Sequence, residues 1–173
     1  MAEKFGREFS KKLTALGYKK GRIFDSGCGF GGTDIVLAKE FPDSEIVGID
    51  LSEPLLKLAQ DHAIKENVQD RVVFEKGDVQ KVRFEDNYFD VVINLNMAHL
   101  VEKPIDMLNE MERVLKPDGM LFIVDLRRSW LCLLEPEIKS GFNLDEAKEL
   151  LGQSKLRAGT FSKSALWWRF TAS

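Results

Sequence analysis

A run of glycines directly after a short apolar segment constrains the fold of this chain more than any other feature. Residues 23–32 read Ile-Phe-Asp-Ser-Gly-Cys-Gly-Phe-Gly-Gly, and a helix-like stretch follows from Thr33 to Phe41. Glycine at alternate positions lets the backbone turn sharply and lets a ligand lie directly against it, where a Cβ atom would clash. The pattern therefore predicts a buried strand, a tight ligand-binding loop and a helix, which together form the first unit of an α/β sheet.

An acid before the glycines indicates which ligand the loop accepts. Gly27, Gly29 and Gly32 satisfy the dinucleotide pattern G-x-G-x-x-G, which leaves an NAD(P)-dependent oxidoreductase open as an alternative. Asp25 would repel a pyrophosphate, because like charges at short distance destabilise each other, and it suits a cationic ligand. S-adenosylmethionine (SAM) carries a sulfonium and an amino group where a dinucleotide carries phosphates, so Asp25 favours SAM.

Strand-like and helix-like patterns alternate along almost the whole chain, which predicts a parallel sheet with helices on both faces. Residues 116–119 (Lys-Pro-Asp-Gly) are a stop-and-turn signal after a helix, and polar residues 162–164 join two strand-like runs into a hairpin. The expected helices cover residues 3–16, 33–41, 52–66, 103–115 and 144–151, and the expected strands cover residues 22–26, 45–50, 72–74, 89–93, 120–126, 156–161 and 165–172.

Three acids fall at the ends of the first three expected strands. In an open parallel sheet, ligands bind outside the carboxyl ends of the strands, where the strand order reverses. Asp25 follows the first strand, and Asp50 lies about twenty residues beyond the glycine loop, a spacing at which a carboxylate can accept both ribose hydroxyls. Asp78 follows the third strand, where it can receive an adenine amino group while Val79 packs on the ring. Their order and spacing predict a nucleoside site.

These motifs resemble the class I SAM-dependent methyltransferases, and within them the ubiquinone/menaquinone-biosynthesis-type branch. The likeness covers roughly residues 20–126 and includes D-x-G-x-G-x-G at the loop, Phe-Asp-Val-Val-Ile-Asn-Leu-Asn-Met-Ala-His-Leu at residues 89–100 and Arg-Val-Leu-Lys-Pro-Asp-Gly at residues 113–119. The resemblance implies a three-layer, doubly wound, seven-stranded α/β sheet, mostly parallel with an antiparallel C-terminal strand. It also implies a single domain with an N-terminal helix (1–19), a SAM-binding core (20–126) and a substrate-side segment with a terminal hairpin (127–173).

The resemblance also implies a set of site residues, with SAM as cofactor, S-adenosyl-L-homocysteine as product and no metal. His99, just beyond the fourth strand, is the candidate general base, because imidazole can take a proton near neutral pH. Its alternative role is local packing at a helix entry, and Asn96 and Met97 either line the acceptor pocket or shape the turn. The expected cofactor-binding residues are Asp25, Gly27, Cys28, Gly29, Gly31, Asp50, Leu51, Asp78, Val79 and Asn94.

Composition narrows the partners and the compartment. A net charge of −3 over 173 residues gives no field that favours nucleic acid, and no segment has the length of a membrane span or of a signal peptide. Two distant cysteines make no disulfide framework, so we expect a cytoplasmic protein. We expect a small or apolar acceptor, while a homodimer, a completing partner chain or a catalytically silent SAM-binding subunit stays open. The cluster at Trp130 could form an acceptor pocket, lid or dimer contact, whereas Trp167 and Trp168 favour core packing.

Overall fold

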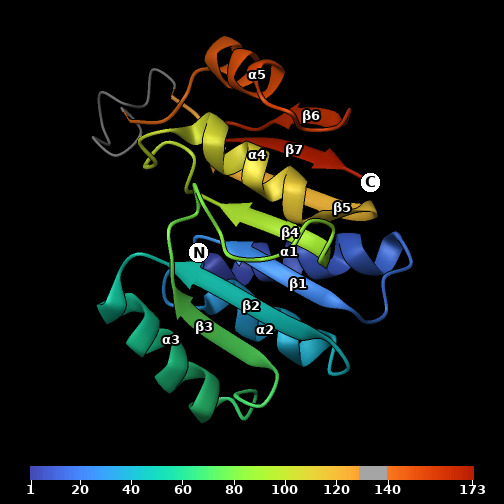
Figure 1. Ribbon diagram of the computed structural model, residues 1–173, viewed down its shortest axis with the longest axis vertical. Helices are drawn as coiled ribbons and strands as arrows, with labels where there is room; N and C mark the ends of the chain where they lie inside the picture. Colours follow the sequence, from blue (N-terminus) through green and yellow to red (C-terminus); the bar gives the residue numbers. More distant parts are fainter. Residues whose placement is uncertain (129–139) are drawn as a thin grey trace.

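The protein folds around one seven-stranded sheet, in which the strand order is β3-β2-β1-β4-β5-β7-β6 (Figure 1). This computed structural model describes residues 1–128 and 140–173. The order reverses between β1 and β4, which is the position where open α/β sheets bind ligands. The strands are β1 (Arg22–Ser26), β2 (Glu45–Asp50), β3 (Val72–Lys76), β4 (Phe89–Leu95), β5 (Leu115–Leu126), β6 (Thr160–Lys163) and β7 (Trp167–Ala172). The helices are α1 (Ala2–Ala15), α2 (Gly32–Glu40), α3 (Glu53–Lys65), α4 (Pro104–Val114) and α5 (Leu144–Gln153).

The pairing of the strands confirms the predicted sheet. β1 to β5 are mutually parallel, whereas β7 enters antiparallel to β5 and pairs with β6 in a terminal hairpin. Several boundaries were predicted wrongly: the strand expected over 156–161 begins only at Thr160, and two further differences concern turns. Residues 115–119, expected as a helix end and a turn, belong to β5 and pair with β4 through an irregular register between Phe89 and Val91. The hairpin turn follows Lys163 instead of beginning at Ser162, because β6 pairs with β7 as far as Trp168.

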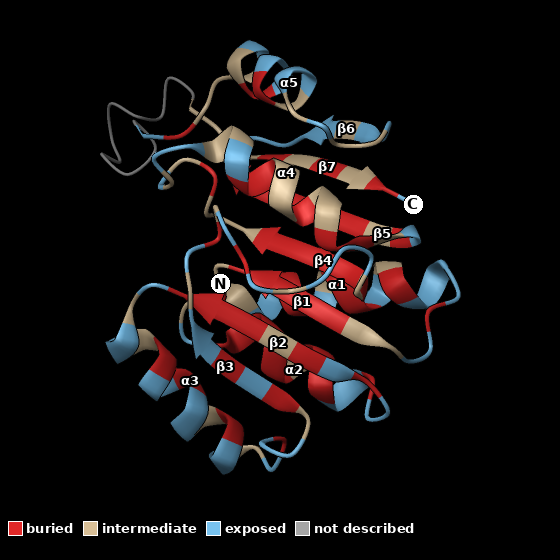
Figure 2. Ribbon diagram, in the orientation of Figure 1, coloured by how far each residue is buried: buried red, intermediate tan, exposed pale blue. Residues whose placement is uncertain are grey.

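The helices cover the two faces of the sheet in separate clusters. Buried side chains of α1, α2 and α3 form one core with the sheet, and those of α4 and α5 form the other. The central strands are buried on both faces, as Figure 2 shows for β1, β4 and β5, which accounts for their continuous apolar runs. The expected three layers are therefore present.

The two C-terminal tryptophans pack on opposite faces of β7. Trp167 meets Phe5 of α1 edge-on, with ring centroids 5.0 Å apart, whereas Trp168 is fully buried and stacks on Phe161 of β6. Adjacent strand residues point to opposite faces, so one tryptophan serves each core. This agrees with the predicted packing role. It also anchors α1 across the sheet, and the N-terminal end of α1 reaches the carboxyl edge of β1, where the Thr33 hydroxyl donates to the Ala2 carbonyl.

Candidate active site

The glycine loop after β1 is held by the end of β2. The amides of Gly27 and Cys28 both donate to the carbonyl of Ile49 at 3.0 Å, and the amide of Gly29 donates to Oδ2 of Asp50 at 2.9 Å. Oδ1 of Asp50 accepts the amide of Ser52, also at 2.9 Å. The carboxylate of Asp50 is therefore fixed in one orientation, with lone pairs left over for further donors.

Gly29 meets the geometric requirement for close contact between backbone and ligand. Its φ of +54° lies in the left-handed region, and a Cβ atom added there would find no heavy atom within 4 Å. Gly31 has a different reason to be glycine. Its Cβ atom would lie 2.5 Å from Cζ of Phe74 and 3.0 Å from Cβ of Ala59, so packing against β3 and α3 requires it. Gly31 also does not line the cavity described next.

A cavity of about 270 Å³ lies over the glycine loop at the carboxyl ends of β1, β2 and β4. The expected cofactor residues that line it are Asp25, Gly27, Cys28, Gly29 and Asp50. Leu95, Asn96, Met97 and Leu100 close the β4 side, so the wall beside the loop is mainly apolar. Four predicted residues from the end of β1 and the glycine loop thus meet Asp50, 21 residues beyond Gly29, at one open site.

The other predicted residues lie around this cavity without lining it. Asp78 borders a neighbouring cavity of about 630 Å³ on the other side of the β2 end, and its carboxylate accepts hydrogen bonds from both the backbone amide and the side-chain amide of Gln80. Val79 is buried in the core under α4, and Leu51 is 56% exposed. The larger cavity lacks the glycine loop, so size alone does not mark the chemical centre.

Polar side chains shape the end of β4. The side chain of Asn94 is buried and donates to the carbonyl of Ser26 at 2.6 Å, which ties β4 to the end of β1. Asn96 has a φ of +57°, and its amide donates to the carbonyl of Val124. Asparagine adopts this left-handed conformation more readily than most residues, and Asn67 and Asn87 do so as well, so the φ of Asn96 reflects the turn after β4. Asn96 and Met97 both line the cavity, which supports the first of their two predicted roles.

The acids under the loop lie in a low-dielectric environment. Asp25 is 2% exposed and Asp34, in the first turn of α2, is fully buried. Burial, together with the charge and hydrogen-bonding capacity of Asp34 and the charge of Asp50, raises the pKa of Asp25 well above its usual range. Burial and the same carboxylates also raise the pKa of the Cys28 thiol, so this cysteine stays protonated and is no nucleophile at neutral pH.

His99 forms a buried pair that the sequence analysis did not anticipate. Its Nδ1 lies 2.6 Å from Oδ1 of Asp125, and its side chain is 4% exposed. Oδ2 of Asp125 accepts the backbone amide of His99 at 3.3 Å. The signal was an acid inside the apolar run Phe-Ile-Val-Asp-Leu of β5, a position where a charge is retained only with a partner. Among the described residues that line the cavity, Met97 and Leu100 flank His99, but His99 itself is absent.

Some predictions concern features beyond this cavity. The cluster at Trp130, and Cys132 with it, lies outside the described residues. In residues 1–128 and 140–173, no helix is long and apolar enough to cross a membrane. The part of the chain that the structure describes also holds no group of three or more His, Cys, Asp or Glu side chains placed to bind a metal ion.

Comparisons with known proteins identify the same architecture. A family model described as a methyltransferase domain matches residues 18–163. The demethylmenaquinone methyltransferase of Lactiplantibacillus plantarum is 37% identical over 116 residues, which cover 66% of this chain and 48% of that protein. Phosphoethanolamine N-methyltransferase 3 of Arabidopsis thaliana is also 37% identical, over 72% of this chain and 25% of its own length. The chain thus spans half or less of these curated relatives.

Solved structures agree on the fold. A SAM-dependent methyltransferase from Aquifex aeolicus superposes with a TM-score of 0.80 at 22% identity, covering 93% of this chain and 86% of that one. An S-adenosyl-L-methionine-dependent methyltransferase structure from Methanococcus maripaludis gives a TM-score of 0.78 at 21% identity, over 95% and 83% of the two chains. With the family model spanning most of the sequence and the seven-stranded sheet superposing on these structures, the chain belongs to the class I SAM-dependent methyltransferases.

Proposed function

We propose that this protein transfers a methyl group from SAM to a small or apolar acceptor and releases S-adenosyl-L-homocysteine. The observation that carries the proposal is the combination of a glycine backbone open to a cavity with an unpartnered carboxyl group beside it. Oδ1 of Asp25 is buried and has no hydrogen-bond partner, although Asp25 lines the cavity. A buried polar atom without a partner is costly, and a bound ammonium group would satisfy it.

The residues of the site fit the parts of SAM. Gly29 offers an open surface for the methionine portion, whereas a Cβ atom at Gly27 would lie 2.7 Å from Cγ of Met97, and Asp25 offers an acceptor for the amino group. Asp50, already oriented by two amides, retains acceptor capacity for the ribose hydroxyls. Asp78, at the next strand end, is the proposed acceptor for the adenine amino group, with Val79 and Leu51 as apolar neighbours and Asn94 holding the β4 end in position.

SAM supplies a methyl group on a positively charged sulfur, which a nucleophile can displace in line. The work left to the protein is alignment of the two reactants, which is worth about 7–11 kcal/mol of the barrier in well-oriented reactions. The rigid attachment of the loop to Ile49 and Asp50 suits that task, because it fixes the floor of the cavity relative to β4. The mainly apolar β4 wall excludes water from the acceptor side.

His99 is the proposed general base, oriented by Asp125. An aspartate that accepts from Nδ1 stabilises the tautomer with a proton on Nδ1, and this leaves the Nε2 lone pair free to take a proton from the acceptor. Asp125 is a positioning residue in this scheme, because it acts only through the imidazole. Met97 and Leu100, close to His99 in the chain, line the cavity, which supports a place for His99 next to the acceptor side.

The rim of the cavity favours an apolar acceptor. Phe30 is 46% exposed and Leu100 is 64% exposed, and both line the cavity. Leu51, 56% exposed, follows Asp50 directly. Exposed apolar side chains gathered at a cavity mouth mark binding surfaces for apolar ligands. We therefore place the acceptor class among molecules with an apolar body and one nucleophilic oxygen, nitrogen or carbon.

Calorimetric titration with SAM and with NADH tests the proposal against the oxidoreductase alternative. We expect SAM to bind with a Kd in the micromolar range, about 8 kcal/mol, and NADH not to bind. Release of S-adenosyl-L-homocysteine is then measured with phenolic, aliphatic-amine and isoprenoid acceptors, with the Asp50→Ala variant as the negative control. Tight SAM binding without release with any acceptor class would favour a silent SAM-binding subunit and contradict the proposed activity.

A further inference from the structure

A second carboxyl group lies buried beside the glycine loop, where the proposed cofactor site needs only one. Asp34 is in the first turn of α2 and is 0% exposed. Neither of its carboxyl oxygens accepts a hydrogen bond from another residue. A first-turn acid in a helix is ordinarily solvated, because its usual role is to face the positive end of the helix dipole from the surface. The burial of Asp34 therefore requires an explanation.

Met1, at the start of α1, lines the same cavity as Asp25, but the side chains that act on the pKa values of Asp34 and Asp25 are acidic. Asp25 comes from β1 and Asp50 from β2, while the Cys28 thiol comes from the loop between them. The carboxyl groups of Asp25 and Asp34 are close enough to share a hydrogen bond once one of them carries a proton. None of the ion pairs found in residues 1–128 and 140–173 involves either carboxyl group.

Two carboxylates in one apolar site cannot both ionise at low cost, so the pair retains a proton at neutral pH. Burial raises the pKa of Asp34 to about 7, although its own amide and the Asp25 carboxyl oppose the rise. Burial and Asp34 raise the pKa of Asp25 as well. An apolar residue at position 34 would avoid the cost of burying an unpaired acid, and such perturbed pairs concentrate at functional sites.

We propose that Asp34 serves the cofactor site through Asp25, since Asp34 itself does not line the cavity: the two carboxyl groups hold a shared proton in the free protein, and this proton is released when the cationic methionine end of SAM binds. The inference rests on the proposed function. When the proton leaves, the O–H bond of one carboxyl group breaks and a buffer base takes the proton. The pair then carries two negative charges next to the ammonium and sulfonium of the ligand, so binding and proton release are linked.

The linkage fixes the direction of the pH dependence. Because binding releases a proton, SAM affinity increases with pH while the pair is protonated in the free protein, by up to about tenfold per pH unit. We expect a several-fold decrease in Kd between about pH 5.5 and pH 7, below the titration of the free ligand's α-amino group. 5′-Methylthioadenosine lacks the amino group and the sulfonium, so its affinity stays constant over that range.

Calorimetry in two buffers of different ionisation enthalpy counts the protons directly. At about pH 6.5, SAM binding to the wild-type protein is expected to release roughly half a proton or more, and 5′-methylthioadenosine binding none. Asp34→Asn keeps the shape of the side chain and should reduce the release by at least about half. Asp61→Asn, on the exposed face of α3, is the matched control and should leave the release unchanged.

The outcomes separate this inference from the proposed function. SAM binding without proton release in the wild-type protein would overturn the shared proton while leaving SAM as the cofactor. Release that persists undiminished in Asp34→Asn would assign the proton to another group and overturn the role of Asp34. Failure of SAM to bind the wild-type protein would overturn the proposed function, and the inference with it. The ligand comparison needs only the wild-type protein, so it holds even where Asp34→Asn does not fold.

Discussion

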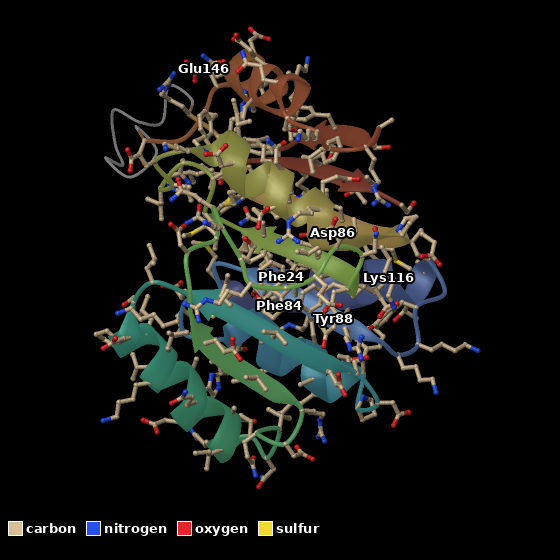
Figure 3. All side chains as sticks on the ribbon, in the orientation of Figure 1. Phe24, Phe84, Asp86, Tyr88, Lys116 and Glu146 are labelled. Atoms are coloured by element: carbon tan, nitrogen blue, oxygen red, sulfur yellow. The ribbon has the colours of Figure 1, made fainter. Side chains whose placement is uncertain are left out.

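The two edges of the sheet use the same acidic residues in opposite ways. At the amino edge, where the strands begin, carboxylates are paired with cations, whereas at the carboxyl edge Asp25, Asp34 and Asp50 have none. Figure 3 shows Asp86, Tyr88 and Lys116 together at the amino edge, on the right of the view. Since both edges belong to one sheet, the difference in pairing separates the groups that stabilise the fold from the groups available to a ligand.

The amino edge is built around Asp90. It accepts the amide of Arg22 at 2.8 Å and the Lys116 ammonium at 2.6 Å, and the Arg22 guanidinium lies 4.3 Å from the centre of the Tyr88 ring. Burial acts to raise the pKa of Asp90, but the Arg22 amide and the Lys116 ammonium outweigh it and lower the pKa. The charged form is therefore the stable one, as expected for a structural ion pair.

Exposed ion pairs such as that of Glu53 with Lys76 occur at the carboxyl edge too, but among its buried acids Asp125 has a basic partner, and that partner is catalytic in our proposal. Asp125 is fully buried and bonded to His99, whereas Asp25 and Asp34 face only each other and Asp50. Asp25 and Asp34 therefore remain available to a cationic ligand, whereas Asp125 orients the imidazole of His99. The comparison teaches that the absence of a cation, more than the presence of an acid, marks the cofactor site.

The largest expected effect is a loss of turnover when the buried pair of His99 and Asp125 is changed. His99→Asn should lower turnover by about 10²–10⁴-fold with SAM affinity nearly unchanged, because the proton acceptor is lost while the cofactor contacts remain. Asp125→Asn should also reduce turnover strongly, since the amide no longer selects the productive tautomer. Steady-state rates and SAM titration measure both. His62→Asn, in α3, is the control, and a loss of only a few-fold in His99→Asn would assign His99 to packing.

The next effect tests whether the glycine loop serves a ligand or only a turn. Gly29→Val should weaken SAM binding by about a hundredfold or more, because Gly29 lines the cavity and the valine side chain would enter it. The φ of +54° adds backbone strain in this variant. Gly17→Val is a matched control, since Gly17 also has a positive φ and open space around it but lies after α1, away from the site. Equal SAM affinities in the two variants would mean that the loop is structural.

A pair of acids, one from each edge, tests the comparison itself. Asp50→Ala should weaken SAM binding at least tenfold, about 1.4 kcal/mol, because it removes the acceptor for the ribose and releases the Gly29 amide. Asp90→Ala should leave SAM affinity unchanged and lower the free energy of unfolding instead. Titration and urea unfolding of both variants measure the two effects. Weaker SAM binding by Asp90→Ala would contradict the assignment of the amino-edge acids to stability alone.

The sequence was sufficient for features that depend on local pattern and spacing. It predicted the alternation of strands and helices, and it brought Asp25, Gly29 and Asp50 to one edge because parallel strands share their carboxyl ends. It could not predict the pairing of His99 with Asp125, because the contact joins the segment after β4 to the neighbouring strand β5, 26 residues further along the chain. The requirement for glycine at position 31 likewise comes from Phe74 of β3.

The burial of Asp34 is the clearest example of a property that the sequence alone does not predict. In the first turn of a helix it reads as a surface acid that complements the helix dipole, and only tertiary packing buries it. The boundary of the hairpin was missed for a similar reason. Polar residues 162–164 look like a turn, but the register with β7 extends β6 through Lys163. The burial of Asp34 and the extent of β6 both follow from long-range contacts overriding local preference.

The smallest effects concern stability without SAM, and they have opposite signs at the two edges. The pair Asp25–Asp34 has raised pKa values in the folded state, so its contribution to stability is fully present below the unfolded value of about 4. That contribution is lost as the pH rises through about 7. Asp90 has a lowered pKa, so its contribution is present above about pH 4 and is lost as the pH falls further.

Asp34→Asn should therefore stabilise the free protein by about 1–2 kcal/mol at pH 8 and by little near pH 4, since the neutral amide can donate to the Asp25 carboxylate. Asp90→Asn should destabilise it by at most about 1 kcal/mol at pH 8, because its ion pair with Lys116 is partly exposed. Urea unfolding midpoints at several pH values, recorded without SAM, measure both variants. If Asp34→Asn destabilised the protein at pH 8, the acid would be holding the fold together, and the two edges would no longer differ in the way their charges are used.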